Sequence, residues 1–478
     1  MAYETVIGLE VHVELSTLTK VFCGCPTEFG AEENTHCCPV CTGMPGALPV
    51  INKKAVEYAV LAGLATHCEI NRYSKMDRKN YFYPDLPKAY QISQYDLPLC
   101  KSGFLEIETE SGETKKIRLN RIHLEEDAGK LVHAPNHSGS LLDMNRCGVP
   151  LLEIVTEPDM RSAQEARSFL ESIKKIMEYI QISDCKMEEG SMRCDVNLSV
   201  RPASSDALGI RTETKNLNSF RSITRVIESE TARQVQLLEQ GVPVVQATLH
   251  WDEDAGETSV LRLKEEAQDY RYFPDPDLAP IHVDDAWFAH IQSFLPELPE
   301  ARRKRFIEQY KLPADAAALL TSDAALADYY EAAAETSQSN LTACHWITGE
   351  LLRLLKEKEV TVSDSPIGPG ALGQLIQFID RGAISGSQAK EVFDIMASTG
   401  ESPESIIRSR SLVQISDSGQ LEEIAARVIQ NNPKSVGDYL AGKEKAIGFL
   451  VGQMMKESKG KANPKLAGEI LTRLMNPS

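Results

Sequence analysis

The stretch Val6-Ile7-Gly8-Leu9-Glu10-Val11-His12-Val13-Glu14-Leu15 decides the fold. Apolar and polar residues alternate along it, and successive strand side chains point to opposite faces of a sheet. The stretch therefore predicts a strand with an apolar face and a second face that carries Glu10, His12 and Glu14. Oxygen and nitrogen ligands two residues apart on a rigid strand suit a divalent cation. A solvated polar face is the commoner reason for such alternation, and only the rest of the chain can decide between the two.

The length and the charge of the chain limit the possible architectures and partners. A chain of 478 residues exceeds one hydrophobic core, so about two or three domains are expected. The net charge of −18 argues against a general polyanion binder. Residues 401–478, however, hold 11 Lys and Arg against 9 Asp and Glu, which leaves −20 on the rest of the chain. A mildly basic tail on an acidic body is compatible with nucleic acid contacting the tail.

The amino-terminal residues and the cysteines indicate the compartment. No run of about 18 apolar residues occurs, and residues 1–5 lead into the first strand without a leader pattern. We therefore expect a cytosolic protein without a membrane span. In that compartment the eleven cysteines are expected to be thiols, metal ligands or nucleophiles rather than disulfides.

Four cysteines in a Gly- and Pro-containing segment form two close pairs. The pairs are Cys23 with Cys25 and Cys38 with Cys41, and twelve residues separate them. This spacing predicts a structural zinc knuckle over residues 23–41 with four thiolate ligands. His36 and Cys37 are spare candidates. A redox pair is the alternative for the C-x-x-C motif, but two pairs without a thioredoxin-like pattern favour zinc.

Acidic side chains recur on later predicted strands. They are Glu125 and Glu126 at the end of a hairpin that starts near residue 103, Asp195 on the polar face of a strand over 192–200, and Glu213 beside Lys215 on the next strand. Three consecutive acids, residues 125–127, at a strand end are uncommon unless they are solvated or bind a metal. A further strand is predicted for Cys185–Glu188, before a turn at Gly190.

An aromatic, proline-rich loop spans residues 75–91 and contains Lys79 and Tyr81. It has neither a helical nor a strand period, as is common in functional loops, although a structural loop fixed by prolines is equally compatible.

The pattern of the chain changes near residue 295, where helical i, i+3, i+4 spacing replaces strand alternation. The sequence predicts an α+β protein with a mixed or antiparallel sheet. The predicted domains are a cradle domain over 1–294, a helical domain over 295–408 and a helical tail over 409–478.

The usual glycine-rich phosphate-binding loops are missing from the sequence. The nearest match, Gly437–Lys443, lies among predicted helices and continues with Glu444 where Ser or Thr would be needed. Any phosphate chemistry must therefore rely on Mg²⁺ held by carboxylates.

Several motifs together resemble a known family. They are Glu4–Glu14, Arg78–Tyr83, His123–Lys130, Lys186–Asn197, Lys215–Phe220 and Asp269–Asp277. In this order, and over essentially the whole chain, they resemble the B subunit of the tRNA-dependent amidotransferases. That family converts Asp-tRNA(Asn) to Asn-tRNA(Asn) and Glu-tRNA(Gln) to Gln-tRNA(Gln). The resemblance implies a catalytic cradle, a helical domain and a YqeY-like tail that holds the tRNA elbow.

The resemblance also implies a reaction and its residues. The side-chain carboxylate of the misacylated Glu or Asp is phosphorylated with ATP and Mg²⁺, and ammonia then displaces the phosphate. The implied Mg·ATP residues are Glu10, His12, Glu125, Glu126, Asp195 and Glu213, and the choice between Glu125 and Glu126 stays open. The implied active-site residues are Lys79, Tyr81, Glu126 and, as a phosphate partner, Lys215.

The implied partners supply ammonia and tRNA. The chain shows no recognisable glutaminase nucleophile, and in the family a separate amidase (glutaminase) subunit provides ammonia through a tunnel while a small third subunit completes a heterotrimer. The zinc cysteines look like those of some family members, which favours a structural zinc. Two alternatives remain open: a non-catalytic, zinc-bearing tRNA-binding scaffold, and a self-sufficient ligase that uses free ammonia. The sequence leaves open whether asparagine, glutamine or both are formed.

Overall fold

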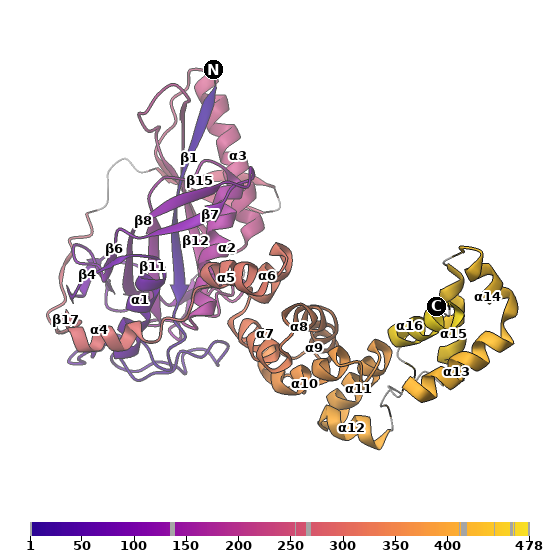
Figure 1. Ribbon diagram of the computed structural model, residues 1–478. Helices are drawn as coiled ribbons and strands as arrows, with labels where there is room; N and C mark the ends of the chain where they lie inside the picture. Colours follow the sequence, from indigo (N-terminus) through magenta and orange to yellow (C-terminus); the bar gives the residue numbers. More distant parts are fainter. Residues whose placement is uncertain are drawn as a thin grey trace. The chain divides into compact units, whose positions relative to one another are not determined.

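The computed structural model describes residues 2–133, 139–253, 255–263, 269–410, 412, 418–443, 445–458, 462 and 464–476. The chain divides into two compact units, Met1–Leu298 and Pro299–Ser478. Within the described residues every strand belongs to the first unit, while the second is helical (Figure 1). This arrangement confirms the predicted α+β class. The predicted domain boundaries at residues 294 and 408 stay predictions.

A ten-stranded sheet forms the frame of the first unit. Its five central strands, in spatial order, are β8 (Thr114–Glu126), β11 (Pro150–Thr156), β1 (Tyr3–Glu14), β12 (Met192–Pro202) and β13 (Thr212–Leu217). All four pairings between these strands are antiparallel. The opening stretch of the sequence is therefore a central strand with a partner on each side.

Shorter strands extend this sheet and form three small ones. The large sheet also contains β2 (Glu69–Ile70), β6 (Cys100–Lys101), β7 (Phe104–Glu108), β14 (Ala247–Asp252) and β15 (Glu257–Leu263). The small sheets pair β3 (Tyr73–Ser74) with β17 (Ile281–His282), β9 (Lys130–His133) with β10 (Ser140–Asp143), and β4 (Asp77–Asn80) with both β5 (Tyr90–Ser93) and β16 (Phe273–Pro274). The strand β4 carries Lys79 from the aromatic loop.

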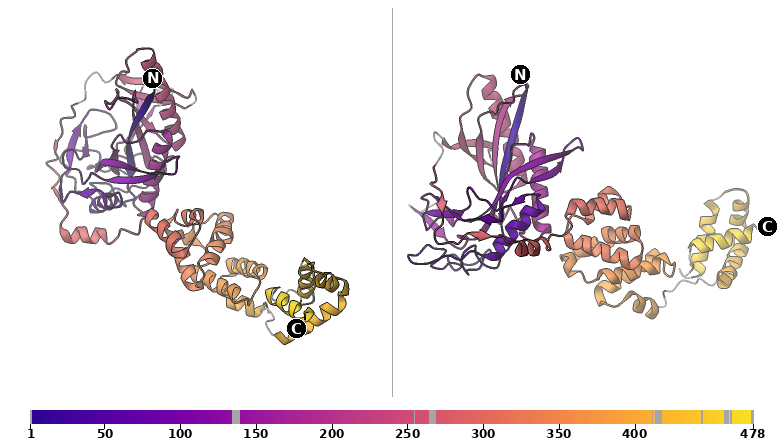
Figure 2. Two further views of the ribbon diagram at one scale, coloured as in Figure 1. Left: turned by 45° about the horizontal axis from the view of Figure 1, so that its top comes forward. Right: turned by 60° about the vertical axis from the view of Figure 1, so that its left-hand side comes forward.

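Helices cover the apolar side of the sheet. Leu9, Val11 and Val13 of β1 are at most 1% exposed and share one core with residues of α2 (Ala163–Tyr179) and α3 (Phe220–Glu239). The two helices lie side by side against the sheet (Figures 1 and 2). Ser162 and Ser219 cap their first turns, since each side chain accepts a backbone N–H three residues later. Two further helices of this unit are α1 (Lys53–Ala65) and α4 (Asp285–Gln292).

The strand predicted for Cys185–Glu188 is wrong. Cys185 has a φ of 45°, which lies outside the β region, and Gly190 has a φ of 85°. Residues 187–190 form a turn in which the Gly190 N–H donates to the Met187 carbonyl at 3.2 Å. The segment is therefore a loop that leads into β12.

The second unit contains two groups of helices with separate cores. The first group comprises α5 (Pro299–Tyr310), α6 (Ala314–Leu320), α7 (Ala324–Ser337), α8 (Asn340–Trp346), α9 (Leu352–Lys358), α10 (Pro369–Asp380), α11 (Gly386–Thr399) and α12 (Pro403–Ser409). The second comprises α13 (Ser418–Asn431), α14 (Pro433–Leu440), α15 (Lys445–Glu457) and α16 (Pro464–Met475). A π-helical turn, Ile347–Leu351, joins α8 to α9. No helix in the described part of the chain has the length and apolar character that a bilayer crossing requires.

Truncating Leu9 should destabilise the first unit. Leu9→Ala removes a side chain that is 1% exposed and leaves a cavity, so we expect a loss of about 2–5 kcal/mol. The control Leu18→Ala alters a side chain that is 92% exposed, and it should change stability by less than about 0.5 kcal/mol. Hydrogen exchange of the β1 and β12 amides in the full chain measures both. Equal protection in all three proteins would contradict the placement of Leu9 in the core.

Candidate active site

Two groups of candidate metal ligands lie on the polar face of the central strands. One group consists of His12, Glu125 and Glu153, and the other of Glu10, Asp195 and Glu213. Within each group, one ligand atom from every residue lies within 4.8 Å of the others. The sequence motifs thus converge on two neighbouring groups, which we call the histidine cluster and the carboxylate cluster.

The strand register brings these residues together. His12 faces Glu153 across the pairing of β1 with β11, and Glu10 faces Asp195 across the pairing of β1 with β12. Glu10 and His12 are two residues apart and so share one face of β1. Because their cross-strand partners lie on opposite sides of β1, this single strand supplies one ligand to each cluster.

Opposite charges pair closely in the histidine cluster. The Glu153 carboxylate lies 3.6 Å from His12 Nε2 and 3.5 Å from His123 Nε2. His123 Nε2 also lies 3.4 Å from Glu125. Burial lowers the pKa of His12, but the hydrogen bond and charge of Glu153, with the charges of Glu125 and Asp195, raise this pKa to about 8. Without a metal, the His12 imidazole therefore carries a proton at neutral pH.

The carboxylate cluster contains a lysine and an unpaired amide oxygen. Lys215 Nζ lies 2.8 Å from both Asp195 Oδ2 and Glu213 Oε1. Asn197 Nδ2 donates to Glu10 Oε1 at 2.9 Å, whereas Asn197 Oδ1 is buried without a hydrogen-bond partner. A buried amide oxygen beside three carboxylates is an additional ligand of the type that hard cations prefer. The donor set of this cluster therefore fits a divalent cation such as Mg²⁺.

Glu126 lies apart from both clusters. It is fully buried, and its carboxylate accepts hydrogen bonds from Lys88 Nζ and from the Ile92 N–H, each at 2.8 Å. Its neighbour Glu125 instead accepts from Ser93 Oγ at 3.0 Å and belongs to the histidine cluster. Adjacent strand residues point in opposite directions, and this rule separates the two acids.

Lys79 and Tyr81 lie at the edge of the histidine cluster. Burial lowers the pKa of Lys79, but the charges of Glu125 and Glu153 raise it above its usual value. Lys79 Nζ lies 5.1 Å from the centre of the Tyr270 ring, and the Tyr81 ring meets that of Tyr270 edge to face. Burial raises the pKa of the Tyr81 hydroxyl. The lysine therefore remains a cation close to the acids.

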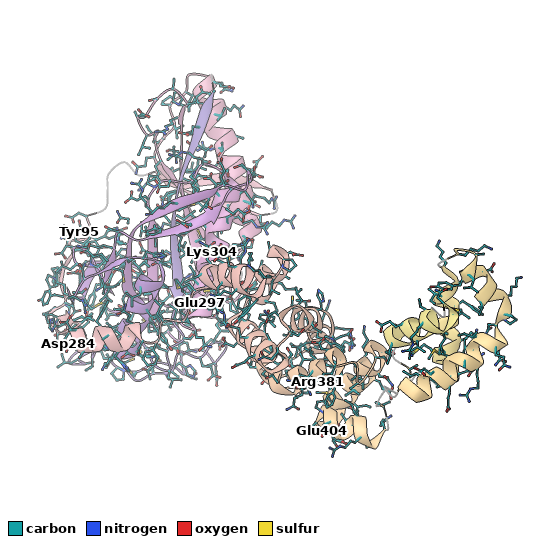
Figure 3. All side chains as sticks on the ribbon, viewed as in Figure 1. Tyr95, Asp284, Glu297, Lys304, Arg381 and Glu404 are labelled. Atoms are coloured by element: carbon teal, nitrogen blue, oxygen red, sulfur yellow. The ribbon has the colours of Figure 1, made fainter. Side chains whose placement is uncertain are left out.

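Stacked aromatic rings extend this edge towards the solvent. Tyr95 stacks on Tyr272 with ring centres 4.4 Å apart, and Tyr272 meets Tyr270 edge to face. Tyr95 is 61% exposed and lies at the surface of the first unit (Figure 3).

Sequence reasoning missed Glu153 and Asn197 as site residues. Glu153 is the single acid in the apolar run Leu151–Val155, and an isolated acid in a buried strand is a usable signal. Asn197 alternates with Asp195 on the polar face of β12, but its unpaired oxygen is visible only in the structure.

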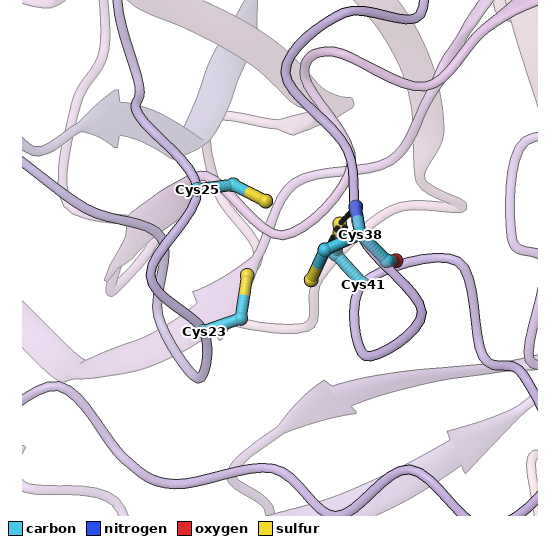
Figure 4. Close-up of side chains that lie close together, drawn as sticks. All are labelled: Cys23, Cys25, Cys38 and Cys41. Atoms are coloured by element: carbon cyan, nitrogen blue, oxygen red, sulfur yellow. Dashed lines mark hydrogen bonds between the residues drawn. The ribbon is translucent and has the colours of Figure 1, made fainter.

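The four cysteines of the predicted knuckle converge on one point (Figure 4). Their sulfur atoms all lie within 4.8 Å of one another, and Cys38 Sγ and Cys41 Sγ are 3.9 Å apart. Tetrahedral zinc with Zn–S bonds of about 2.3 Å places its sulfurs about 3.8 Å apart. The hydrogen bond from Cys23 and the backbone N–H of Cys38 lower the pKa of Cys41 to about 4, although burial opposes this. The site therefore fits zinc.

The two spare candidates lie outside this group of four. Cys37 Sγ donates to the Asn34 carbonyl at 3.1 Å, and His36 Nδ1 is buried without a hydrogen-bond partner.

The loop of the knuckle also packs on Lys88. Lys88 Nζ lies 5.0 Å from the centre of the Phe22 ring. A Cβ atom at Gly43, which has a φ of 69°, would come within 2.6 Å of Lys88 Cγ. The knuckle thus contacts the lysine that pairs with Glu126.

Comparison with known proteins covers nearly the whole chain. Residues 5–289 match the family described as the GatB/GatE catalytic domain, and residues 328–475 match the GatB domain family. The aspartyl/glutamyl-tRNA(Asn/Gln) amidotransferase B subunits of Caldicellulosiruptor bescii and Caldicellulosiruptor saccharolyticus are 57% and 58% identical, each over 98% of both chains. A B subunit of the same name from Clostridium acetobutylicum is 51% identical over the full length of both chains. These matches confirm the resemblance read from the sequence motifs, and the chain belongs to the GatB family of amidotransferase B subunits.

Proposed function

We propose that this chain activates and amidates the side chain of a misacylated tRNA. The substrate is Glu-tRNA(Gln) or Asp-tRNA(Asn), as the names of the relatives suggest. The observation that carries the proposal is the pair of ligand clusters on one polar face of the sheet. Two adjacent cation sites suit a reaction in which ATP and a carboxylate, both anionic, must meet.

The proposed chemistry has two steps. A carboxylate is a poor electrophile because its oxygen is a poor leaving group. Transfer of the γ-phosphoryl group of ATP to that oxygen releases ADP and gives an acyl phosphate. Ammonia then attacks the carbonyl carbon, phosphate leaves, and the side chain becomes an amide. Bound Mg²⁺ would offset the negative charge that gathers in the first step.

The residues of the chain have separate roles in this proposal. His12, Glu125 and Glu153 hold one cation, and the carboxylate cluster holds the other. Lys215 is 41% exposed, so its ammonium can turn from Asp195 to the transferred phosphoryl group when a cation takes up that carboxylate.

Lys79 and Tyr81 bind the acyl end of the substrate at the edge of the histidine cluster. Glu126 acts indirectly in this proposal, through the Ile92 N–H and Lys88, because its carboxylate is bonded to both. It thereby fixes the end of β8, where Glu125 is placed.

The relatives are named as one lettered subunit of an enzyme, which implies further subunits. We propose an amidase (glutaminase) subunit that releases ammonia from glutamine, a small third subunit that completes a heterotrimer, and a tRNA that contacts the carboxy-terminal helices. Delivery between subunits has a physical reason, since free ammonia at neutral pH is mostly protonated and then cannot attack. Shape recognition of the tRNA is expected to matter, because residues 401–478 hold only two more basic than acidic residues. The cysteine cluster holds a structural zinc.

Replacing Asp195 should abolish the first step. Asp195→Asn removes a negative ligand from the carboxylate cluster, and we expect ATP-dependent phosphorylation of Glu-tRNA(Gln) by the reconstituted complex to fall at least about 100-fold. The control Asp285→Asn alters an acid whose side chain is fully exposed and should have no effect. Phosphorylation is measured as ADP release that depends on Glu-tRNA(Gln). Unchanged rates in Asp195→Asn would favour the non-catalytic scaffold.

Cation binding at the histidine cluster should depend on pH. His12 must lose its proton to coordinate a metal, and its pKa in the metal-free protein is about 8. We expect the affinity to rise about tenfold per pH unit below that pKa and to level off above it. Titration with Mn²⁺ between about pH 6 and about pH 9, followed by electron paramagnetic resonance, tests this. His12→Asn should flatten the profile, and a flat profile in the parent would exclude His12 as a ligand.

Zinc content should depend on the four clustered cysteines only. We expect the parent to contain one zinc per chain and Cys41→Ser to lose it during dialysis against a chelator, since a thiolate ligand is missing. Cys37→Ser is the matched control, because Cys37 lies in the same loop but outside the cluster. Atomic absorption gives the stoichiometry. Equal loss of zinc from both variants, or a parent without zinc, would contradict the knuckle.

A further inference from the structure

Lys20 is a completely buried cation behind the cysteine cluster. Its side chain is 0% exposed, and Nζ donates to the His36 carbonyl at 2.7 Å and to the Met144 carbonyl at 3.3 Å. Its third contact is Cys41 Sγ, 3.7 Å away. Burying an ammonium costs several kcal/mol unless a partner compensates its charge. Within the described residues these contacts include no carboxylate, so the sulfur is the available anionic partner.

We propose that Lys20 is part of the metal site as its charge partner and N–H···S donor. This inference rests on the proposed zinc knuckle. Zinc with four thiolates carries a net charge of about −2, and a buried net charge of that size is strongly disfavoured at low dielectric. The ammonium beside Cys41 reduces the local charge to about −1. Lys20 thus favours the thiolate form that binds metal, and it is a positioning residue rather than a ligand.

The position of Lys20 supports this role over that of an ordinary buried lysine. Lys20 lies only three residues before Cys23, the first cysteine of the cluster, and at the amino-terminal side of the loop that the metal closes. Its Nζ reaches across that loop to the second cysteine pair, through Cys41 Sγ and the carbonyl before Cys37. One side chain therefore connects the two halves of the knuckle at the sulfur itself.

A purely structural clamp is the alternative role, and the fold provides a matched control for it. Asn145 connects the same two segments without contacting sulfur. Its Oδ1 accepts from the His36 N–H at 2.8 Å, and its Nδ2 donates to the Glu32 carbonyl at 2.7 Å. Removal of Asn145 therefore loosens the clamp and leaves the charge beside Cys41 in place.

Three variants of the full chain test the proposal: Lys20→Met, Lys20→Gln and Asn145→Ala. Zinc affinity is measured by competition with a chromogenic chelator. We expect Lys20→Met to bind zinc about 10- to 100-fold more weakly, the range found when groups that support metal ligands are removed. Asn145→Ala should stay close to the parent. Lys20→Gln keeps an N–H donor without the charge and should fall between them. Hydrogen exchange of the β1 amides verifies that each variant is folded.

Cobalt provides a readout that a structural role does not change. In the Co²⁺-substituted protein the sulfur-to-metal charge-transfer band reports the electron density on the thiolates. Loss of the ammonium beside Cys41 should shift this band to lower energy in Lys20→Met. Asn145→Ala should leave it in place.

The possible outcomes separate this proposal from the zinc knuckle itself. A parent that binds neither zinc nor cobalt overturns both. A parent that binds zinc, with Lys20→Met binding equally tightly or an unshifted cobalt band in that variant, overturns the role of Lys20 alone. Equal weakening by Asn145→Ala would likewise reduce Lys20 to a clamp.

Discussion

The antiparallel register of β1 between β11 and β12 is the constraint on which the candidate site depends. The side-chain period of a strand is two, so a shift of one residue would turn Glu10 and His12 into the apolar core and bring Leu9 and Val11 to the polar face. Burial of the charged groups without partners would cost several kcal/mol. The alternation that makes the core therefore also fixes which acids meet, and fold and site are specified by the same ten residues.

The price of this arrangement is a concentration of acids of like charge within a partly buried surface. Glu10 illustrates it, since burial and the charge of Glu153 both raise the pKa of its carboxyl. Lys79 and Lys215 offset part of the repulsion, the second through direct contacts with Asp195 and Glu213. The site is thus held in a state whose charges a cation would complete, as is common where function opposes stability.

Local sequence revealed the strands and most ligands, because strand periodicity and cysteine spacing are local signals. The division into two clusters was not predictable, since it depends on which strands neighbour β1. The choice between Glu125 and Glu126 needed the direction of the last residues of β8. Glu153 was overlooked because one acid in an apolar run contributes little to any periodic pattern. The strand expected at residues 185–188 failed because Cys185 adopts a positive φ, a conformation that composition does not signal.

The contact between Gly43 and Lys88 links the cysteine knuckle to the acids mechanically. There is no space for a side chain at Gly43, and the positive φ independently favours glycine, so the loop can approach Lys88 as closely as two backbones allow. The loop therefore acts as a cover that keeps water from the buried pair of Lys88 and Glu126. Oxidation of a knuckle thiol would lift that cover, and damage to sulfur would be transmitted to the end of β8 without any ligand of the clusters being touched. In this sense the zinc site serves as a fastener for a region in which it takes no chemical part.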